Sequence, residues 1–115
     1  MNYMEQFQMQ QIGLAYDEFR PEFAARLFPG GLEEAAGLAK RLAPLFFPNT
    51  DWVAEHYQTC FQFYSTYALD RLMGYDDGYA EQDCKNKFTG LSPLTLHCAV
   101  EHCQAQLRRA FPTLS

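Results

Sequence analysis

The chain has 115 residues, of which 14 are Asp or Glu and nine are Lys or Arg, so its formal net charge is −5. This length suits one domain with one core and is too short for two, and a hydrophobic content of 48% excludes a disordered chain. An acidic surface repels phosphate, so the charge argues against direct binding to nucleic acid or anionic membranes and favours a basic protein partner.

The first part of the chain predicts three helices separated by Pro and Gly. Spacings of three and four residues predict a helix over residues 3–19, with an apolar face made of Met9, Ile12, Tyr16 and Phe19. Pro21 suits the first position of a short second helix, which Pro29 and the two following glycines end. A third helix is expected over residues 32–47, with an apolar stripe made of Leu32, Ala35, Ala39, Leu42 and Phe46.

A long helix is predicted in the middle of the chain. Asn49 or Thr50 is expected to cap it, and it should run to Met73 and stop at Gly74. More than half of its circumference is apolar or aromatic, so we expect it to be central and packed on two sides. Arg71 falls inside this apolar arc, where its charged end should reach solvent or pair with a carboxylate. The arc comprises Val53, His56, Tyr57, Cys60, Phe61, Phe63, Tyr64, Tyr67, Ala68 and Leu72.

The last part predicts a turn and two more helices. Residues 75–79 have the composition of a turn, and a short helix should follow near residues 80–88. Ser92 as N-cap and Pro93 at the first helical position predict a final helix to about Ala110. Its core face should consist of Leu96, Ala99, Val100, Cys103, Leu107, Ala110 and Phe111. Since no segment is typical of a strand, we expect an all-α fold: a single compact helical bundle of four main helices plus one or two short ones, within one domain spanning residues 1–115.

Membrane and secretion signals are not apparent in the sequence. No apolar run of about 18 residues predicts a transmembrane helix, and the first residues lack the basic and apolar regions of a signal peptide. We therefore expect a cytoplasmic protein, in which the four cysteines, at positions 60, 84, 98 and 103, are reduced thiols.

Two His/Cys pairs with i,i+4 spacing are the candidate metal ligands. His56 and Cys60 share one strip of the long helix, and Cys98 and His102 share one strip of the last helix. The second pair lies opposite the apolar face of its helix, so it should not meet the core-facing first pair. We therefore expect no metal and no cofactor, and we expect the aromatic run over residues 60–67 to be core rather than a haem pocket.

An acidic, tyrosine-containing segment is the candidate partner-binding site. It does not match an EF-hand calcium loop, because Gly78 is third from Asp76 and the twelfth position is Lys87. Its ordinary explanation is a solvated turn that begins a helix. Its functional explanation is a docking surface in which tyrosines supply contact area and carboxylates attract a basic partner. This acidic tyrosine patch consists of Tyr75, Asp76, Asp77, Tyr79, Glu81 and Asp83.

These features favour an interaction protein over an enzyme. Cys98 and His102 lie in mid-helix, without a nearby oxyanion donor, and no other catalytic arrangement is present in the sequence. The favoured function is a small acidic cytosolic binding module, of the inhibitor or immunity type. It would occlude the basic, nucleic-acid-binding surface of a partner such as a nuclease toxin. The alternatives are a metal- or haem-binding helical protein that uses the His/Cys pairs, and a homodimeric structural subunit whose long helix needs a second copy to bury its apolar arc.

Overall fold

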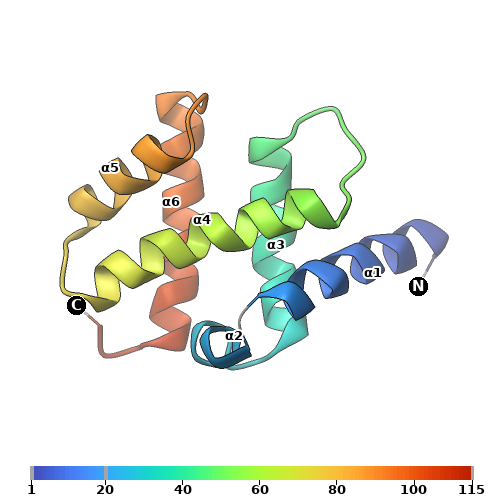
Figure 1. Ribbon diagram of the computed structural model, residues 1–115, viewed down its shortest axis with the longest axis horizontal. Coiled ribbons are helices and arrows are strands. Elements are labelled where there is room, and N and C mark those ends of the chain that lie inside the picture. Colours follow the sequence, from blue (N-terminus) through green and yellow to red (C-terminus); the bar gives the residue numbers. More distant parts are fainter. Residues whose placement is uncertain (1, 20, 115) are drawn as a thin grey trace.

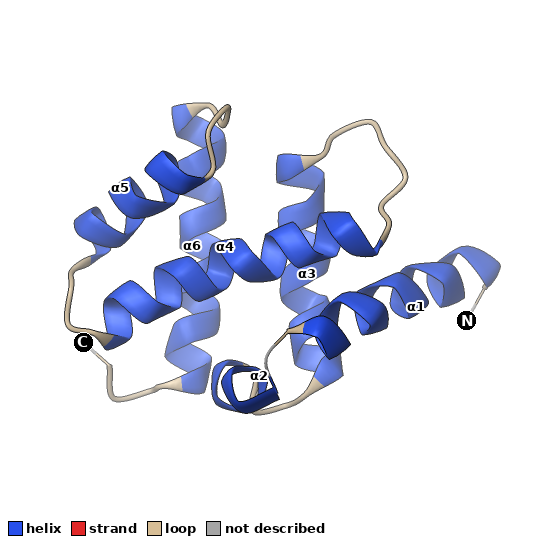
Figure 2. Cartoon of the chain, in the orientation of Figure 1, coloured by secondary structure: helices blue, strands red, loops and turns tan. Residues whose placement is uncertain are grey.

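The computed structural model describes residues 2–19 and 21–114, and these residues form helices and loops without a strand (Figure 2). The all-α prediction is confirmed for this part of the chain. The described helices are six, of which four have 15 to 19 residues and two, α2 and α5, have 7 and 11. They are α1 (Tyr3–Glu18), α2 (Pro21–Leu27), α3 (Leu32–Phe46), α4 (Ala54–Leu72), α5 (Asp77–Lys87) and α6 (Pro93–Ala110).

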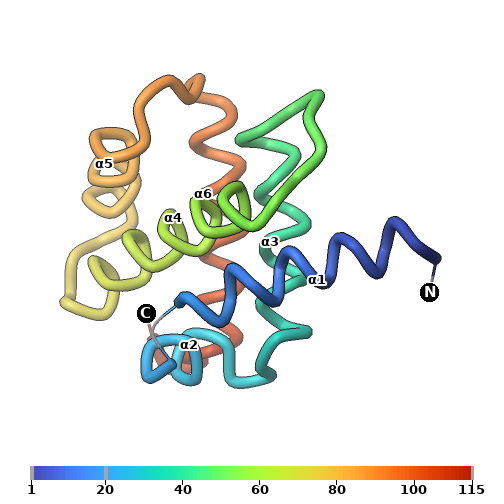
Figure 3. The backbone as a smooth tube through the Cα atoms, turned by 45° about the vertical axis from the view of Figure 1, so that its right-hand side comes forward, coloured from blue at the N-terminus to red at the C-terminus, as the bar shows by residue number. Residues whose placement is uncertain are grey.

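The helices pack in two crossed layers around α4. Helices α3 and α6 lie side by side, and α4 crosses both of them in front (Figures 1 and 3). Helix α1 packs along the first part of α4, and α5 packs against its last part and against α6. The predicted central position of α4 is therefore confirmed, since it contacts α1, α3, α5 and α6. The radius of gyration of 13.6 Å is that of a compact globule of this size.

The core is built mainly from the apolar arc of α4 and the apolar faces of α3 and α6. The predicted arc is buried at seven of its ten positions, whereas Val53 remains 39% exposed. On α6 the predicted face is correct for Leu96, Ala99, Val100, Cys103 and Leu107, all of which are buried. On α3 the prediction is wrong for Leu32, which is 36% exposed because it begins the helix at the edge of the molecule.

The beginning of α4 is the largest error of the sequence prediction. Neither Asn49 nor Thr50 caps the helix, which begins at Ala54 after a loop, with Val53 at the N-cap position. The first free N–H groups are satisfied by other side chains: His56 Nδ1 accepts from the Val53 N–H at 3.0 Å, and Gln11 Oε1 of α1 accepts from the Ala54 N–H at 3.0 Å. A partner 43 residues away replaces the local cap that the sequence pattern suggested.

Helix α5 begins earlier than expected. The predicted turn over residues 75–79 is wrong in its second half, because Asp76 is an N-cap whose side chain accepts a hydrogen bond from the Tyr79 N–H at 2.8 Å. Residues 77–79 are therefore the first turn of α5. By contrast, the predicted Ser92 cap of α6 is confirmed, since its hydroxyl accepts from the Thr95 N–H at 3.1 Å.

The carboxyl end of α2 is fixed by two buried polar side chains. The Leu27 carbonyl oxygen accepts hydrogen bonds from the Tyr64 hydroxyl at 3.3 Å and from the Gln106 side-chain amide at 3.2 Å. Gln106 is only 2% exposed, and the sequence pattern did not predict its burial. These bonds satisfy an otherwise orphaned helix-end carbonyl and connect α2 to α4 and α6.

Among the described residues, no helix is long and apolar enough to cross a membrane.

Candidate functional site

The acidic tyrosine patch lies at the corner where α4 turns into α5 (Figure 1). Tyr75 and Tyr79 stack on each other there, with ring centroids 4.1 Å apart and an interplanar angle of 15°. The two tyrosines are 43% and 49% exposed, so the pair presents ring surface to solvent in a fixed arrangement. Met73, 70% exposed, lies just before them in the chain and adds a third uncovered apolar side chain.

Asp77 is held in place from α4 rather than free to meet a partner. Its carboxylate accepts a hydrogen bond from the Tyr67 hydroxyl and lies 2.9 Å from Arg71 Nε. Arg71 therefore pairs with a carboxylate, one of the two roles that its place in the apolar arc predicted. Burial raises the pKa of Asp77, but the bonds from Tyr67 and Gln104 and the charge of Arg71 more than offset this and lower the pKa.

Two other carboxylates of the patch have partners across a helix interface or within α5. Glu81 Oε1 lies 3.4 Å from Nδ1 of His97 on α6. Asp83 lies 3.4 Å from Lys87 Nζ, one turn later in α5. Asp83 also hydrogen-bonds the half-buried Asp70 of α4; burial, that bond and the Asp83 charge raise the pKa of Asp70 to about 6. Since Asp76 caps α5, all four carboxylates of the patch have partners in the fold.

The patch therefore combines uncovered aromatic surface with carboxylates that are already oriented. The geometry of the carboxylates is set by their partners in the fold. The rings of Tyr75 and Tyr79 contact each other and are 43% and 49% exposed, so a partner can reach them. This arrangement can bind another molecule through contact with the tyrosine rings and through attraction of cations.

The two His/Cys pairs have ordinary structural surroundings. His56 packs against Phe47 with ring centroids 4.4 Å apart and caps α4, while Cys60 is fully buried. Burial raises the pKa of the Cys60 thiol to about 12, so it stays protonated at neutral pH. Cys98 and His102 are half-buried on the other side of α6 from its core face. Within residues 2–19 and 21–114, no three His, Cys, Asp or Glu side chains lie close enough to hold a metal ion.

The apolar arc that suggested a homodimer is covered within one chain. Four of its large side chains, Tyr57, Phe61, Phe63 and Tyr64, are at most 1% exposed. The aromatic run also has the predicted core role: Phe61 packs against Phe28 with ring centroids 5.8 Å apart.

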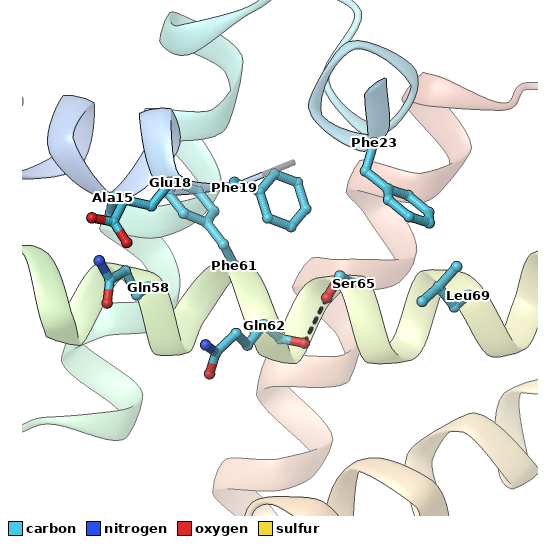
Figure 4. Close-up of a pocket in the computed structure, with 9 residues that line it drawn as sticks. All are labelled: Ala15, Glu18, Phe19, Phe23, Gln58, Phe61, Gln62, Ser65 and Leu69. Atoms are coloured by element: carbon cyan, nitrogen blue, oxygen red, sulfur yellow. Dashed lines mark hydrogen bonds between the residues drawn. The ribbon is translucent and has the colours of Figure 1, made fainter. Parts of the chain in front are cut away.

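Sequence reasoning missed a groove between α1, α2 and α4. Figure 4 shows this cavity, with a volume of about 450 Å³. Phe19, Phe23 and Phe61 give it apolar walls, and the carboxylate of Glu18 and the amide of Gln62 lie at its edge. No sequence pattern marks this groove, because its walls come from three helices that tertiary packing brings together.

Comparisons of the chain with protein-family models, with curated proteins and with solved structures gave no match, so the inference of function rests on the residues and geometry described above.

Proposed function

We propose that this chain is a small acidic cytosolic binding module, of the inhibitor or immunity type, that covers the basic nucleic-acid-binding surface of a partner protein. The observation that carries the proposal is the stacked, half-exposed pair of Tyr75 and Tyr79 beside four carboxylates, on a chain of net charge −5.

The stacked rings support an anchoring role for thermodynamic reasons. Stacking fixes both side chains before binding, so little side-chain entropy is lost when a partner covers them. Tyr has two side-chain torsions and a large amphipathic surface, and it is enriched among the residues that contribute most to interface affinity. Met73 extends the same surface and can adapt to an irregular partner.

The carboxylates support the choice of a basic partner. A protein that binds nucleic acid carries a positive surface, and an acidic inhibitor is attracted to that surface at long range. Glu81 and Asp76 are the carboxylates whose charge a partner would meet first, since Asp77 is neutralised in part by Arg71 and Asp83 by Lys87. Binding should therefore be faster and tighter at low salt.

Affinity capture from the native cell lysate at low salt, followed by mass spectrometry, tests the proposal. The unmodified chain should retain one dominant basic protein, and the Tyr75→Ala/Tyr79→Ala double variant should lose it. Leu14→Ala is the matched control, because Leu14 is 52% exposed on α1, outside the patch. Equal capture by the double variant, or capture of no basic protein, would contradict the proposal.

The homodimer remains an alternative, supported by the exposed apolar side chains of Tyr3, Met4 and Leu14 on α1. Light scattering at several protein concentrations distinguishes the two states, since a dimer doubles the scattering mass.

A further inference from the structure

A second groove lies at the opposite end of α4 from the acidic tyrosine patch. It is lined by residues of the first two turns of α1, of the loop that leads into α4, and by Tyr57 of α4, and its volume is about 750 Å³. Figure 1 shows where α1 and this loop lie. Cavities of about 300 to 1,000 Å³ are typical of sites for small organic ligands. The groove shares no residue with the acidic tyrosine patch or with the groove of Figure 4.

Tyr57, a buried residue that lines this groove, has an unsatisfied polar atom. Tyr57 is 0% exposed, and its buried hydroxyl makes no hydrogen bond of ordinary geometry with a described residue. Burial raises the pKa of this hydroxyl, and the Gln8 side chain beside it offsets part of the rise. By geometry, the hydroxyl has no hydrogen-bond partner within the described part of the chain. A buried donor without an acceptor is costly and uncommon, so a ligand acceptor at this point would be stabilised.

Aromatic side chains line the groove, and one of them has a fixed orientation. The indole N–H of Trp52 donates to the Phe47 carbonyl oxygen at 2.9 Å, which holds the Trp52 ring in one orientation. Phe7 of α1 also lines the groove, and the neighbouring Tyr3 and Met4 are 78% and 64% exposed. The groove therefore presents ring and thioether surface that no described residue covers.

The rim of the groove is negative. Glu5 and Asp51 are exposed carboxylates on its two sides, and no Lys, Arg or His is among the described residues that line it. An organic cation at this rim would be attracted by both carboxylates and by the faces of the aromatic rings. An organic anion would be repelled by the same groups.

We propose that this groove binds a small aromatic amine that carries a hydrogen-bond acceptor at the end opposite its ammonium group. The acceptor reaches the Tyr57 hydroxyl, the ring lies between Trp52 and Phe7, and the ammonium lies at the rim with Glu5 and Asp51. The site is independent of the proposed protein-binding function, because the two share no residue.

Three probes of similar size test the three parts of this proposal. Tyramine has both the hydroxyl and the ammonium, phenethylamine lacks the hydroxyl, and 3-(4-hydroxyphenyl)propionate replaces the ammonium with a carboxylate. Binding is measured by isothermal titration and by the fluorescence of Trp52, the only tryptophan in the chain. Tyramine should bind about tenfold more tightly than the propionate, a difference of the size expected for favourable against unfavourable charge. It should also bind severalfold more tightly than phenethylamine.

Variants assign these differences to particular residues. Tyr57→Phe removes only a hydroxyl whose proton has no acceptor among the described residues, so the chain should stay folded, and the preference for tyramine over phenethylamine should disappear. Asp51→Asn should reduce the preference for tyramine over the propionate. Asp17→Asn, an exposed carboxylate of α1 outside the groove, is the matched control and should change neither preference. Equal or tighter binding of the propionate, or no response of Trp52 to any probe, would overturn the proposal.

Discussion

The carboxyl pair of Asp70 and Asp83, which joins α4 to α5, makes the stability of the protein depend on pH. The Asp70 pKa is raised from 3.8 to about 6 by burial, by the hydrogen bond to Asp83 and by its charge, with Lys87 opposing the shift. Because the folded pKa lies above the unfolded one, the protonated pair stabilises the fold below about pH 4. That contribution is lost as the pH rises through about 6 and is absent at higher pH.

Replacement of Asp70 by asparagine should remove this dependence. The new side-chain amide would donate a hydrogen bond to Asp83 at every pH, whereas the native pair must carry two negative charges above about pH 6. The shift in pKa sets an upper limit of about 3 kcal/mol on the effect. Since Asp70 is only half-buried, solvent screening should reduce this to about 1 to 1.5 kcal/mol.

Urea unfolding followed by far-ultraviolet circular dichroism at pH 4 and pH 7 measures the effect. The free energy of unfolding of Asp70→Asn, relative to the native chain, should increase by about 1 to 1.5 kcal/mol between the two pH values. The exposed-carboxylate variant Asp17→Asn should show no such increase. If Asp70→Asn changes the free energy of unfolding by the same amount at both pH values, the raised pKa of Asp70 does not contribute to stability as described.

Two further predictions concern buried polar groups. Tyr64→Phe and Gln106→Leu should each lower the free energy of unfolding by about 1 kcal/mol. The loss is small because, in each variant, the Leu27 carbonyl oxygen still accepts one of its two hydrogen bonds. The double variant removes both donors from the Leu27 carbonyl. Its loss of unfolding free energy, measured by urea unfolding, should therefore exceed the sum of the losses of the two single variants. Losses that simply add would contradict the idea that the two side chains share one acceptor. In thiol labelling at pH 8, the half-buried Cys98 should react first, and the three buried cysteines should react only on unfolding. Fast labelling of more than one thiol in the native protein would contradict this.

The sequence predicted the elements that depend on local signals. The Ser92 cap with Pro93 after it, and the core face of α6, are correct because capping and helical periodicity act within a few residues. The predicted start of α4 is wrong because its cap comes partly from Gln11, far away in the chain. The burial of Gln106 could not be predicted either, since its partner is a carbonyl of α2.

The candidate site was predicted in composition but not in geometry. Tyr75 and Tyr79 are both exposed, and their rings stack across the Asp76 cap that begins α5, an arrangement that composition alone does not reveal. The partners of Glu81 and Asp83 lie partly on other helices, so periodicity within one segment could not reveal them. The Trp52 groove was missed because its two sides come from segments far apart in the chain, and such contacts are set by tertiary packing.

The proposed function is to cover the nucleic-acid-binding surface of a basic partner. A competition assay tests this proposal: a labelled oligonucleotide is bound to the captured partner, and the fluorescence anisotropy of the oligonucleotide is followed as the chain is added. The chain should release the oligonucleotide in proportion to the amount of chain bound to the partner, and the Tyr75→Ala/Tyr79→Ala variant should not. A ternary complex, in which the chain and the oligonucleotide bind the partner together, would contradict it.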